Sequence, residues 1–244
     1  MLPERTGRWW SPYPPRVEVV FGGGLWPLGQ KVGFVQLELA GAIEAYRGWT
    51  RGWKPPRPSF KQVREALLID QLPRLLPLEM PYTRRLLVAH GQRWTAIFDN
   101  SRGGGDPYPP VAELSRIAGT RGVLAGHTPQ EQYPYPATQL HLFGSQGDYV
   151  RTIDCGVFDS GRWSFEARGT EQPFEELATY SSRRVRDLFT RPMLLRYLSA
   201  LGIDADTMST YGPAVLVQAR FVRVSWRATL DEARTEASHG RAQT

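Results

Sequence analysis

The sequence predicts a mixed α+β protein whose sheet is mainly antiparallel and built from hairpins, with several short helices packed on it. In the middle of the chain, strand patterns follow one another through short turns, whereas helical patterns dominate nearer the C-terminal end. The 24 glycines and 20 prolines favour short elements joined by turns and loops. With 244 residues, of which 41% are hydrophobic, the chain is long enough to bury a sizeable core.

The first third of the chain mixes extended and helical patterns. Residues 17–21 alternate and are rich in valine, which predicts a short strand that ends at Gly22. Apolar residues recur at helical spacing over 34–49. A second helix is predicted from Ser59, as its N-cap, to a stop at Pro73.

The middle of the chain carries the clearest strand patterns. Residues 85–90 and 94–98 flank a glycine turn and are predicted to form a hairpin. A helix is expected over 111–118, because Pro110 opens it and Gly119 closes it. Further strands are expected at 121–125, 138–143, 149–158 and 162–167, with a turn at 159–161.

The end of the chain is predicted to be mainly helical. A short helix capped by Ser181 or Ser182 is expected to carry Val185, Leu188 and Phe189 on one face. A second helix is expected over 190–201, closed by Gly202, before a last strand at 214–224. Residues 229–244 are polar and are expected to form a flexible C-terminal tail. We therefore predict a single α+β domain over residues 1–228, in which the sequence allows one sub-boundary near residue 82.

The chain is basic. It has 30 Lys and Arg against 24 Asp and Glu, which gives a formal net charge of +6 and an isoelectric point near 9.7. This balance suits an anionic partner such as nucleic acid. The basic residues recur in small groups along the sequence, however, and a solvated arginine-bearing face is the more common outcome.

Cysteine usage and hydropathy predict the compartment. Cys155 is the only cysteine, which excludes an intramolecular disulfide and favours a reducing compartment. No apolar run reaches the length of about 18 residues that a bilayer span needs. Residues 1–15 lack the continuous apolar stretch of a signal peptide. We expect a cytoplasmic protein without a membrane partner.

No phosphate-binding motif keeps the spacing that its chemistry requires. The glycine-rich segment 24–31 comes closest to a P-loop, whose lysine must follow the second glycine directly. Here Gln30 intervenes before Lys31, and Val32 stands where a hydroxyl group would bind magnesium. The segment is interpreted as a turn.

Histidines and aspartates provide no local site either. The four histidines form no pair at metal-ligand spacing, and most aspartates fall at turns, where they bond to their own backbone. No catalytic residue, metal ligand or cofactor is assigned. An enzyme with a site assembled from dispersed residues stays as one hypothesis. It requires His90, His127 or His141 beside an aspartate in one pocket.

Aromatic side chains in loops rich in proline and glycine are the most prominent feature without an assigned role. Surface aromatics near arginines are typical anchors for partners, and they can also stack on bases. The alternative is that the large rings pin the loops to the core. The partner-binding candidates are Trp9, Trp10, Trp26, Trp53, Tyr133, Tyr135, Arg183 and Arg184.

The C-terminal third to half of the chain carries a recurring set of aromatic, glycine and charged positions. They are Gly161-Arg-Trp163-Ser-Phe165-Glu166, Gly169, Pro173-Phe174-Glu175, Tyr180, Arg183, Arg186-Asp187, Leu194, Tyr197, Leu201-Gly202-Ile203 and Tyr211-Gly212. This set resembles a pattern in a family of bacterial proteins that have no established activity. Its aromatics, turns and capped helices describe a fold and not an active site.

By analogy, proteins of this pattern are similar to small cytoplasmic immunity-type proteins, which bind and neutralise a partner. The leading hypothesis is therefore a non-enzymatic cytoplasmic protein of immunity-like or accessory type that binds another protein. The alternatives are a nucleic-acid-binding protein that uses a basic surface, and the enzyme with a dispersed site described above.

Overall fold

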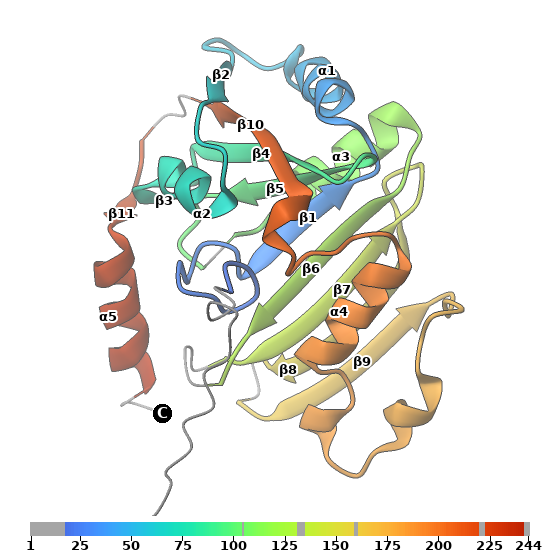
Figure 1. The fold of residues 1–244 in the computed structure, drawn as a ribbon. Coiled ribbons are helices and arrows are strands. Elements are labelled where there is room, and N and C mark those ends of the chain that lie inside the picture. Colours follow the sequence, from blue (N-terminus) through green and yellow to red (C-terminus); the bar gives the residue numbers. More distant parts are fainter. Residues whose placement is uncertain (1–17, 104, 131–134, 159–160, 220–222, 242–244) are drawn as a thin grey trace, which may run out of the picture.

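The computed structural model describes residues 18–241 apart from 104, 131–134, 159–160 and 220–222. Its frame is a nine-stranded sheet in the order β2-β10-β4-β5-β1-β6-β7-β8-β9, in which every pairing is antiparallel (Figure 1). Consecutive strands from β6 to β9 pair as hairpins. The predicted α+β class with a mainly antiparallel sheet is confirmed.

The strands and helices of the described chain have the following bounds. The large sheet comprises β1 Lys31–Val35, β2 Ser59–Val63, β4 Arg84–His90, β5 Trp94–Asp99, β6 Gly122–Thr128, β7 Ala137–Phe143, β8 Tyr149–Val157, β9 Trp163–Gly169 and β10 Tyr211–Gln218. A small second sheet pairs β3 Leu78–Met80 with β11 Trp226–Ala228. The α-helices are α1 Leu39–Thr50, α2 Leu68–Gln71, α3 Tyr108–Ala118, α4 Arg191–Ala200 and α5 Leu230–Arg241. Short 3-10 turns are η1 Leu72–Leu75, η2 Leu177–Ser181, η3 Val185–Asp187 and η4 Met208–Thr210.

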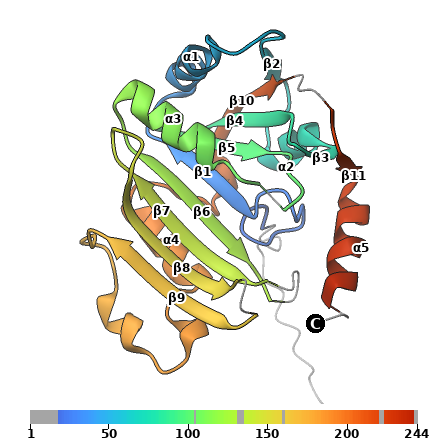
Figure 2. The same ribbon diagram turned by 180° about the vertical axis from the view of Figure 1, so that it is seen from behind.

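The sheet separates two hydrophobic cores, because the central strands are apolar on both faces. In β4, Leu86 and Val88 belong to one core and Leu87 to the other. The larger core contains side chains from α2, η1 and α4, and the smaller one contains side chains from α1 and α3. Figure 2 shows α3 lying across the sheet on the side of the smaller core.

Helix α3 lies directly on β1 and β6 because two strand positions are glycines. A Cβ atom on Gly33 would come within 2.4 Å of Val111, and one on Gly122 within 2.4 Å of the Ser115 hydroxyl. At the helix end, Gly119 adopts the left-handed conformation (φ 60°), as the sequence predicts. This close packing fixes the start of β6, which matters for the cleft described below.

The N-terminal third differs from the prediction in two places. Residues 18–30 form turns and not a strand, and residues 59–63 form β2 where a helix was predicted. Phe60 joins one core and Val63 the other, as a strand allows. The hydrogen bonds of β2 are made to β10, some 150 residues later in the chain. A local pattern gives no sign of that partner, so the helical interpretation of this segment was wrong.

The C-terminal segment also differs from the prediction, since residues 230–241 form α5 and not a flexible tail. Thr229 and Glu232 make a capping box, in which the Thr229 N–H donates to the Glu232 carboxylate (2.7 Å) and the Glu232 N–H donates to the Thr229 hydroxyl (3.2 Å). Arg234 then ties the helix to the body by donating to the carbonyls of Trp26 and Gly24 (2.8 and 2.7 Å).

Elements from both sides of residue 82 share the large sheet. Strand β1 lies between β5 and β6, and β2 forms one edge beside β10. The chain before residue 82 is therefore interleaved with the chain after it. Within the described residues, no helix has the length and apolar character needed to span a bilayer.

Candidate partner-binding cleft

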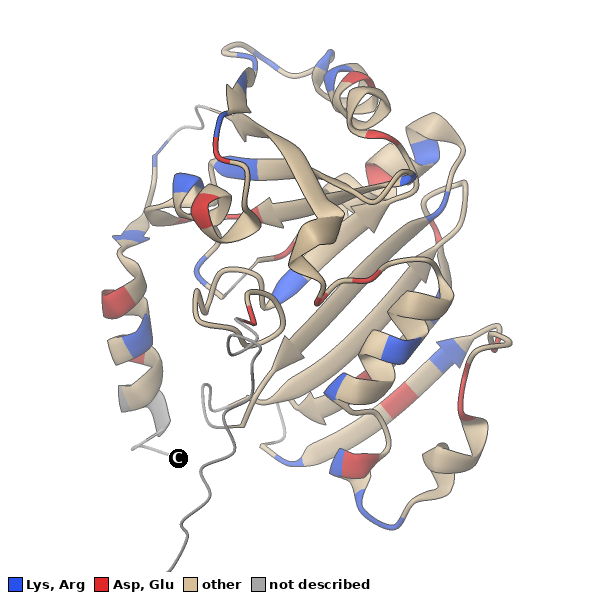
Figure 3. Ribbon diagram, in the orientation of Figure 1, with Lys and Arg blue, Asp and Glu red and all other residues tan. Residues whose placement is uncertain are grey.

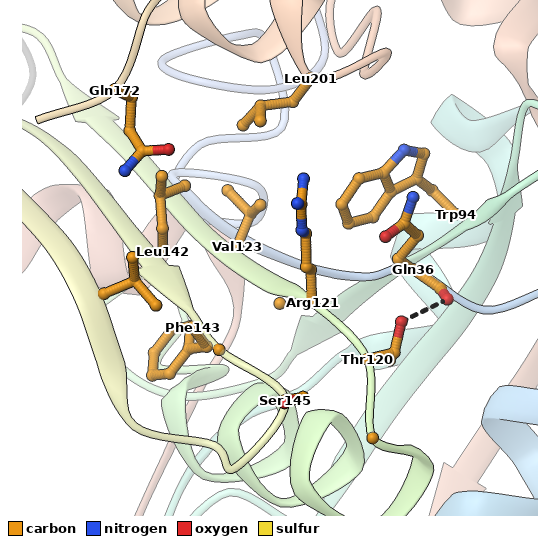
Figure 4. Close-up of a pocket in the computed structure, with 14 residues that line it drawn as sticks. Gln36, Trp94, Thr120, Arg121, Val123, Leu142, Phe143, Ser145, Gln172 and Leu201 are labelled. Carbon is orange, nitrogen blue, oxygen red and sulfur yellow. Dashed lines mark hydrogen bonds between the residues drawn. The ribbon is translucent and has the colours of Figure 1, made fainter. Parts of the chain in front are cut away.

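A cleft of about 430 Å³ opens at one end of the large sheet, beside the C-terminal end of α4. It is formed where β1 and β7 end, where β5, β6 and β8 begin, and where the segment after β9 passes over the sheet (Figure 4). Its side chains therefore come from segments spread between residues 36 and 201.

The floor and one wall of the cleft are apolar. Val123 and Leu142 are paired neighbours on β6 and β7, and their side chains lie on the same face of the sheet. Val150 extends this floor on β8, and Leu201 covers it from the end of α4 (Figure 4). The buried indole of Trp94 forms the wall towards β5.

The polar groups of the cleft are mainly hydrogen-bond donors. Arg121 is exposed, and its guanidinium extends into the cleft beside Trp94 (Figure 4). Among the described residues, neither this guanidinium nor the side-chain amide of Gln36 has a hydrogen-bond or ion-pair partner, and the Trp94 N–H has no acceptor. No Asp or Glu of the described residues lines the cleft. The arrangement therefore favours an anionic group lying over an apolar floor.

Backbone contacts hold Arg121 at this position. The Gln36 N–H donates to the Arg121 carbonyl (2.9 Å), and the Thr120 hydroxyl donates to the Gln36 carbonyl (3.1 Å). These two bonds extend the β1–β6 pairing beyond Val35. Side chains alternate along a strand, so Arg121 shares the face of Val123, while Gly122 between them lies against α3.

Gln172 closes the opposite side of the cleft. Its backbone N–H donates to the Glu175 carboxylate (2.8 Å), and its side-chain amide donates to the Thr170 carbonyl (2.7 Å). Glu175 in turn pairs with the buried Arg151 of β8 through two hydrogen bonds, of 2.9 and 2.6 Å. The loop that carries Gln172 is thus fixed to the sheet.

A second, smaller hollow of about 150 Å³ continues the cleft. It shares Gln36, Trp94 and Leu201 with the larger one and adds Arg93. Arg93 is exposed and, within the described residues, has no ion-pair partner. The described residues that line the two hollows include two arginines and no carboxylate.

Of the aromatic candidates from the sequence, those within the described residues lie in different environments, and none of these lines the cleft. Trp9, Trp10 and Tyr133 lie outside the described residues. Trp26 is only 7% exposed, and Trp53 packs edge-to-face on Trp49 (5.1 Å between ring centres). Burial of Trp26 and the ring contact of Trp53 are typical of the alternative that the sequence left open, in which large rings pin loops to the core.

Tyr135, Arg183 and Arg184 are exposed, and Tyr135 has 48% of its surface accessible. The two arginines lie in the turn between η2 and η3. The structure brings none of the three to the cleft. They remain candidates for separate contacts with a partner.

Two of the histidines on which the enzyme hypothesis depends are buried in separate places. His90 packs against Tyr211 (4.6 Å between ring centres) and Phe34, and burial lowers its pKa to about 4. His127 lies 3.0 Å from the Thr138 hydroxyl, and its pKa is also lowered to about 4, mainly by burial. Neither lines the cleft.

His141 does meet an aspartate, on the sheet face opposite the cleft floor. Its Nε2 lies 2.8 Å from Asp154, which also accepts a hydrogen bond from Gln139 (2.7 Å). Its Nδ1 is buried and has no hydrogen-bond partner among the described residues. Both ring nitrogens are therefore withheld from a substrate, and we interpret the pair as a structural contact between β7 and β8.

Cys155 is buried in the larger core, and the acidic residues of the described chain form no metal-binding cluster. Burial raises the pKa of the Cys155 thiol, which donates to the Val185 carbonyl (3.1 Å), as expected of a small core residue. No group of three or more His, Cys, Asp or Glu residues within the described chain could hold a metal ion.

Sequence reasoning missed Gln36, Trp94, Arg121 and Gln172. A lone arginine at the start of a strand carries no motif, and the cleft exists only because β6 lies between β1 and β7. No family model, curated protein or solved structure matches this chain. The site is therefore interpreted from its geometry.

Proposed function

We propose that this chain is a non-enzymatic cytoplasmic protein of immunity-like or accessory type, whose cleft binds an acidic and partly apolar segment of another protein. The observation that carries the proposal is a set of donors, from Arg121, Gln36 and Trp94, that have no partner among the described residues. They lie above an apolar floor, and no carboxylate of the described chain lines the cleft. An apolar centre with a polar rim is the usual anatomy of a protein interface.

The lining residues favour binding over catalysis. They include no Asp, Glu, His, Cys or Lys that could serve as a general base or as an activated nucleophile. Ser145 is exposed at the rim, and no histidine lies among its neighbours in the lining. An arginine beside an indole is instead a common anchor of recognition surfaces.

Each part of the cleft has a role in this proposal. Arg121 pairs with an Asp or Glu side chain, or with a C-terminal carboxylate, through two parallel hydrogen bonds. Gln36 and the Trp94 N–H bond to the partner's backbone carbonyls. A neighbouring apolar side chain of the partner fills the floor over Val123 and Leu142.

The test begins with capture of partners from a lysate of the source organism. The partner that the native chain retains is then purified, and its Kd is measured by calorimetry against the native chain and Arg121→Gln. We expect the substitution to raise the Kd by about tenfold, equivalent to about 1.4 kcal/mol.

The matched control is Arg223→Gln, which removes the same charge from another exposed arginine outside the cleft. Its Kd should stay within about twofold of the native value. A Gln36→Ala variant probes the cleft without changing its charge. If neither cleft variant weakens binding more than the control does, the partner binds elsewhere and the proposal is wrong.

A further inference from the structure

The net positive charge of the chain is concentrated in one segment. Residues 47–64, which we call the basic edge, contain Arg47, Arg51, Lys54, Arg57, Lys61 and Arg64 and no acidic residue. These six residues equal the formal net charge of +6. The remainder of the chain therefore has as many acidic as basic residues and is formally neutral.

The basic edge lies along the side of the large sheet that ends in strand β2. It comprises the last turn of α1, the loop after it and β2, which is the terminal strand of the sheet (Figure 1). Lys and Arg follow one another every three or four residues along it. Figure 3 shows these basic positions around the loop that joins α1 to β2.

The cations of the basic edge are mostly available to a ligand. All six residues are exposed. Arg47 pairs with Glu44 (2.6 Å) and lies over the Phe60 ring (5.0 Å). The other five have no ion pair among the described residues. A surface on which five of the six cations have no carboxylate partner in the described chain attracts polyanions.

Three of the arginines share a hollow of about 330 Å³. Arg47, Arg51 and Arg57 line it, together with Thr50, Pro58 and Phe60 and with Glu44, which Arg47 neutralises. Planar guanidinium groups suit the oxygens of a phosphate group. The hollow therefore offers one phosphate position within a longer basic surface.

The basic edge lacks the features of a protein interface. Within residues 47–64 of the described chain, no large hydrophobic side chain is exposed. The Trp49 ring is already contacted by Tyr46, Trp53 and the Arg85 guanidinium. This surface therefore has neither the apolar centre of a protein interface nor a free ring for base stacking.

We propose that the basic edge binds the phosphodiester backbone of double-stranded nucleic acid without sequence preference. This function is separate from that of the cleft, because Arg121 lies outside the basic edge. In this proposal, the six basic residues that account for the net charge of the chain contact phosphate groups. Charged side chains on a terminal strand also prevent that strand from pairing with the sheet of another molecule. This protective role is compatible with phosphate binding, because it leaves the charged groups exposed to solvent.

The test measures binding to labelled DNA and RNA duplexes of about 20 base pairs by fluorescence anisotropy, from about 50 to about 200 mM salt. We expect the slope of log Kd against log salt to lie between about 2 and 5. An Arg51→Gln and Arg57→Gln double variant should raise the Kd about tenfold at about 100 mM salt and reduce the slope by about 2. Tight binding of either duplex supports the proposal, because both share the phosphate backbone.

The matched control is the Arg168→Gln and Arg196→Gln double variant, which lowers the net charge equally at exposed positions on β9 and α4. It should bind within about twofold of the native chain. Circular dichroism verifies the folding of each variant, and Arg121→Gln should bind duplexes like the native chain. Absence of binding at about 50 mM salt, equal losses in both double variants, or equal competition by polyglutamate would each refute the proposal.

Discussion

At the scale of single residues, the contact between Arg151 and Glu175 is the most fully buried ion pair of the described chain. Their side chains are 5% and 0% exposed. The carboxylate also accepts hydrogen bonds from the Tyr180 hydroxyl (3.1 Å) and the Gln172 N–H (2.8 Å). Arg151 donates in addition to the Gly169 carbonyl (3.1 Å). This network fixes the loop that closes one side of the cleft.

Substitution of Glu175 by Gln should destabilise the protein strongly. The neutral amide leaves the buried guanidinium of Arg151 without a counter-charge, and such a loss costs about 3–5 kcal/mol. The measurement is the free energy of unfolding from denaturant titration. The control is Arg168→Gln, whose pair with Glu166 is exposed on both sides and should contribute less than about 1 kcal/mol. Equal effects of the two substitutions would contradict this account.

The sequence pattern predicted the role of a residue correctly where that role depends on its neighbours in the chain, as at the end of a helix. Glu175 belongs to the set of positions that the sequence interpretation treated as architectural, and the structure gives it a buried structural contact. Gly119 and Gly202 both adopt positive φ where a helix end was expected. Arg121 has no such pattern, because its role depends on groups from other strands.

At the scale of elements, the contact of α3 with β6 determines where the cleft lies. Gly122 lets the helix approach the strand, and the neighbouring Arg121 and Val123 face the cleft. The Gln36–Arg121 backbone bond then joins β1 to the same position. A change in the distance between α3 and β6 should therefore change the positions of Arg121 and Val123 in the cleft.

Substitution of Gly122 by Ala should destabilise the protein by about 1–3 kcal/mol, because the new methyl group overlaps Ser115 and Val111, both completely buried. Thermal unfolding measures the effect. Gly52→Ala provides the control, since a Cβ atom there meets nothing within 4 Å, and its change should stay within about 0.5 kcal/mol. A G122A protein as stable as the native chain would show that α3 can shift without cost.

Helix α5 shows a local signal that was present in the sequence and was not used. The spacing of Thr229 and Glu232 is that of a capping box, and Ala233 and Ala237 form the buried stripe of the helix. The prediction of a flexible tail rested on the polar composition of the segment and did not take the capping box and the two alanines into account. Strand β2 was mistaken for the opposite reason, because its decisive partner, β10, is distant in sequence.

At the scale of the whole molecule, the sheet joins segments from nearly the whole described chain. Strand β1 is the central strand of the sheet. Strands β7, β8 and β9 lie on one side of the β1–β6 pair, and β5, β4 and β10 lie on the other side, so this pair joins the two halves of the sheet. The same arrangement places the cleft at one end of the central strands and the basic edge on a terminal strand. One fold thus supports two separate surfaces.

A fragment of residues 83–244 should not fold on its own. It lacks β1 and β2, and loss of β1 leaves β5 and β6 with unpaired edges in the middle of the sheet. Near-ultraviolet circular dichroism and thermal melting of this fragment, beside the full chain, provide the measurement. A cooperative melt of the fragment would instead establish a domain boundary near residue 82.

The sequence by itself determined the fold class, most strands after residue 84, the helices at 108–118 and 191–200, and the absence of familiar catalytic spacing. These features follow from patterns and turn residues that act over a few positions. The excess charge of residues 47–64 is also present in the sequence, where the basic residues stand three or four positions apart and form no short basic group. Tertiary structure alone decided the β2–β10 pairing and the meeting of Gln36, Trp94, Arg121 and Gln172. Those contacts join residues 27 to 159 positions apart, and no local pattern encodes such distances.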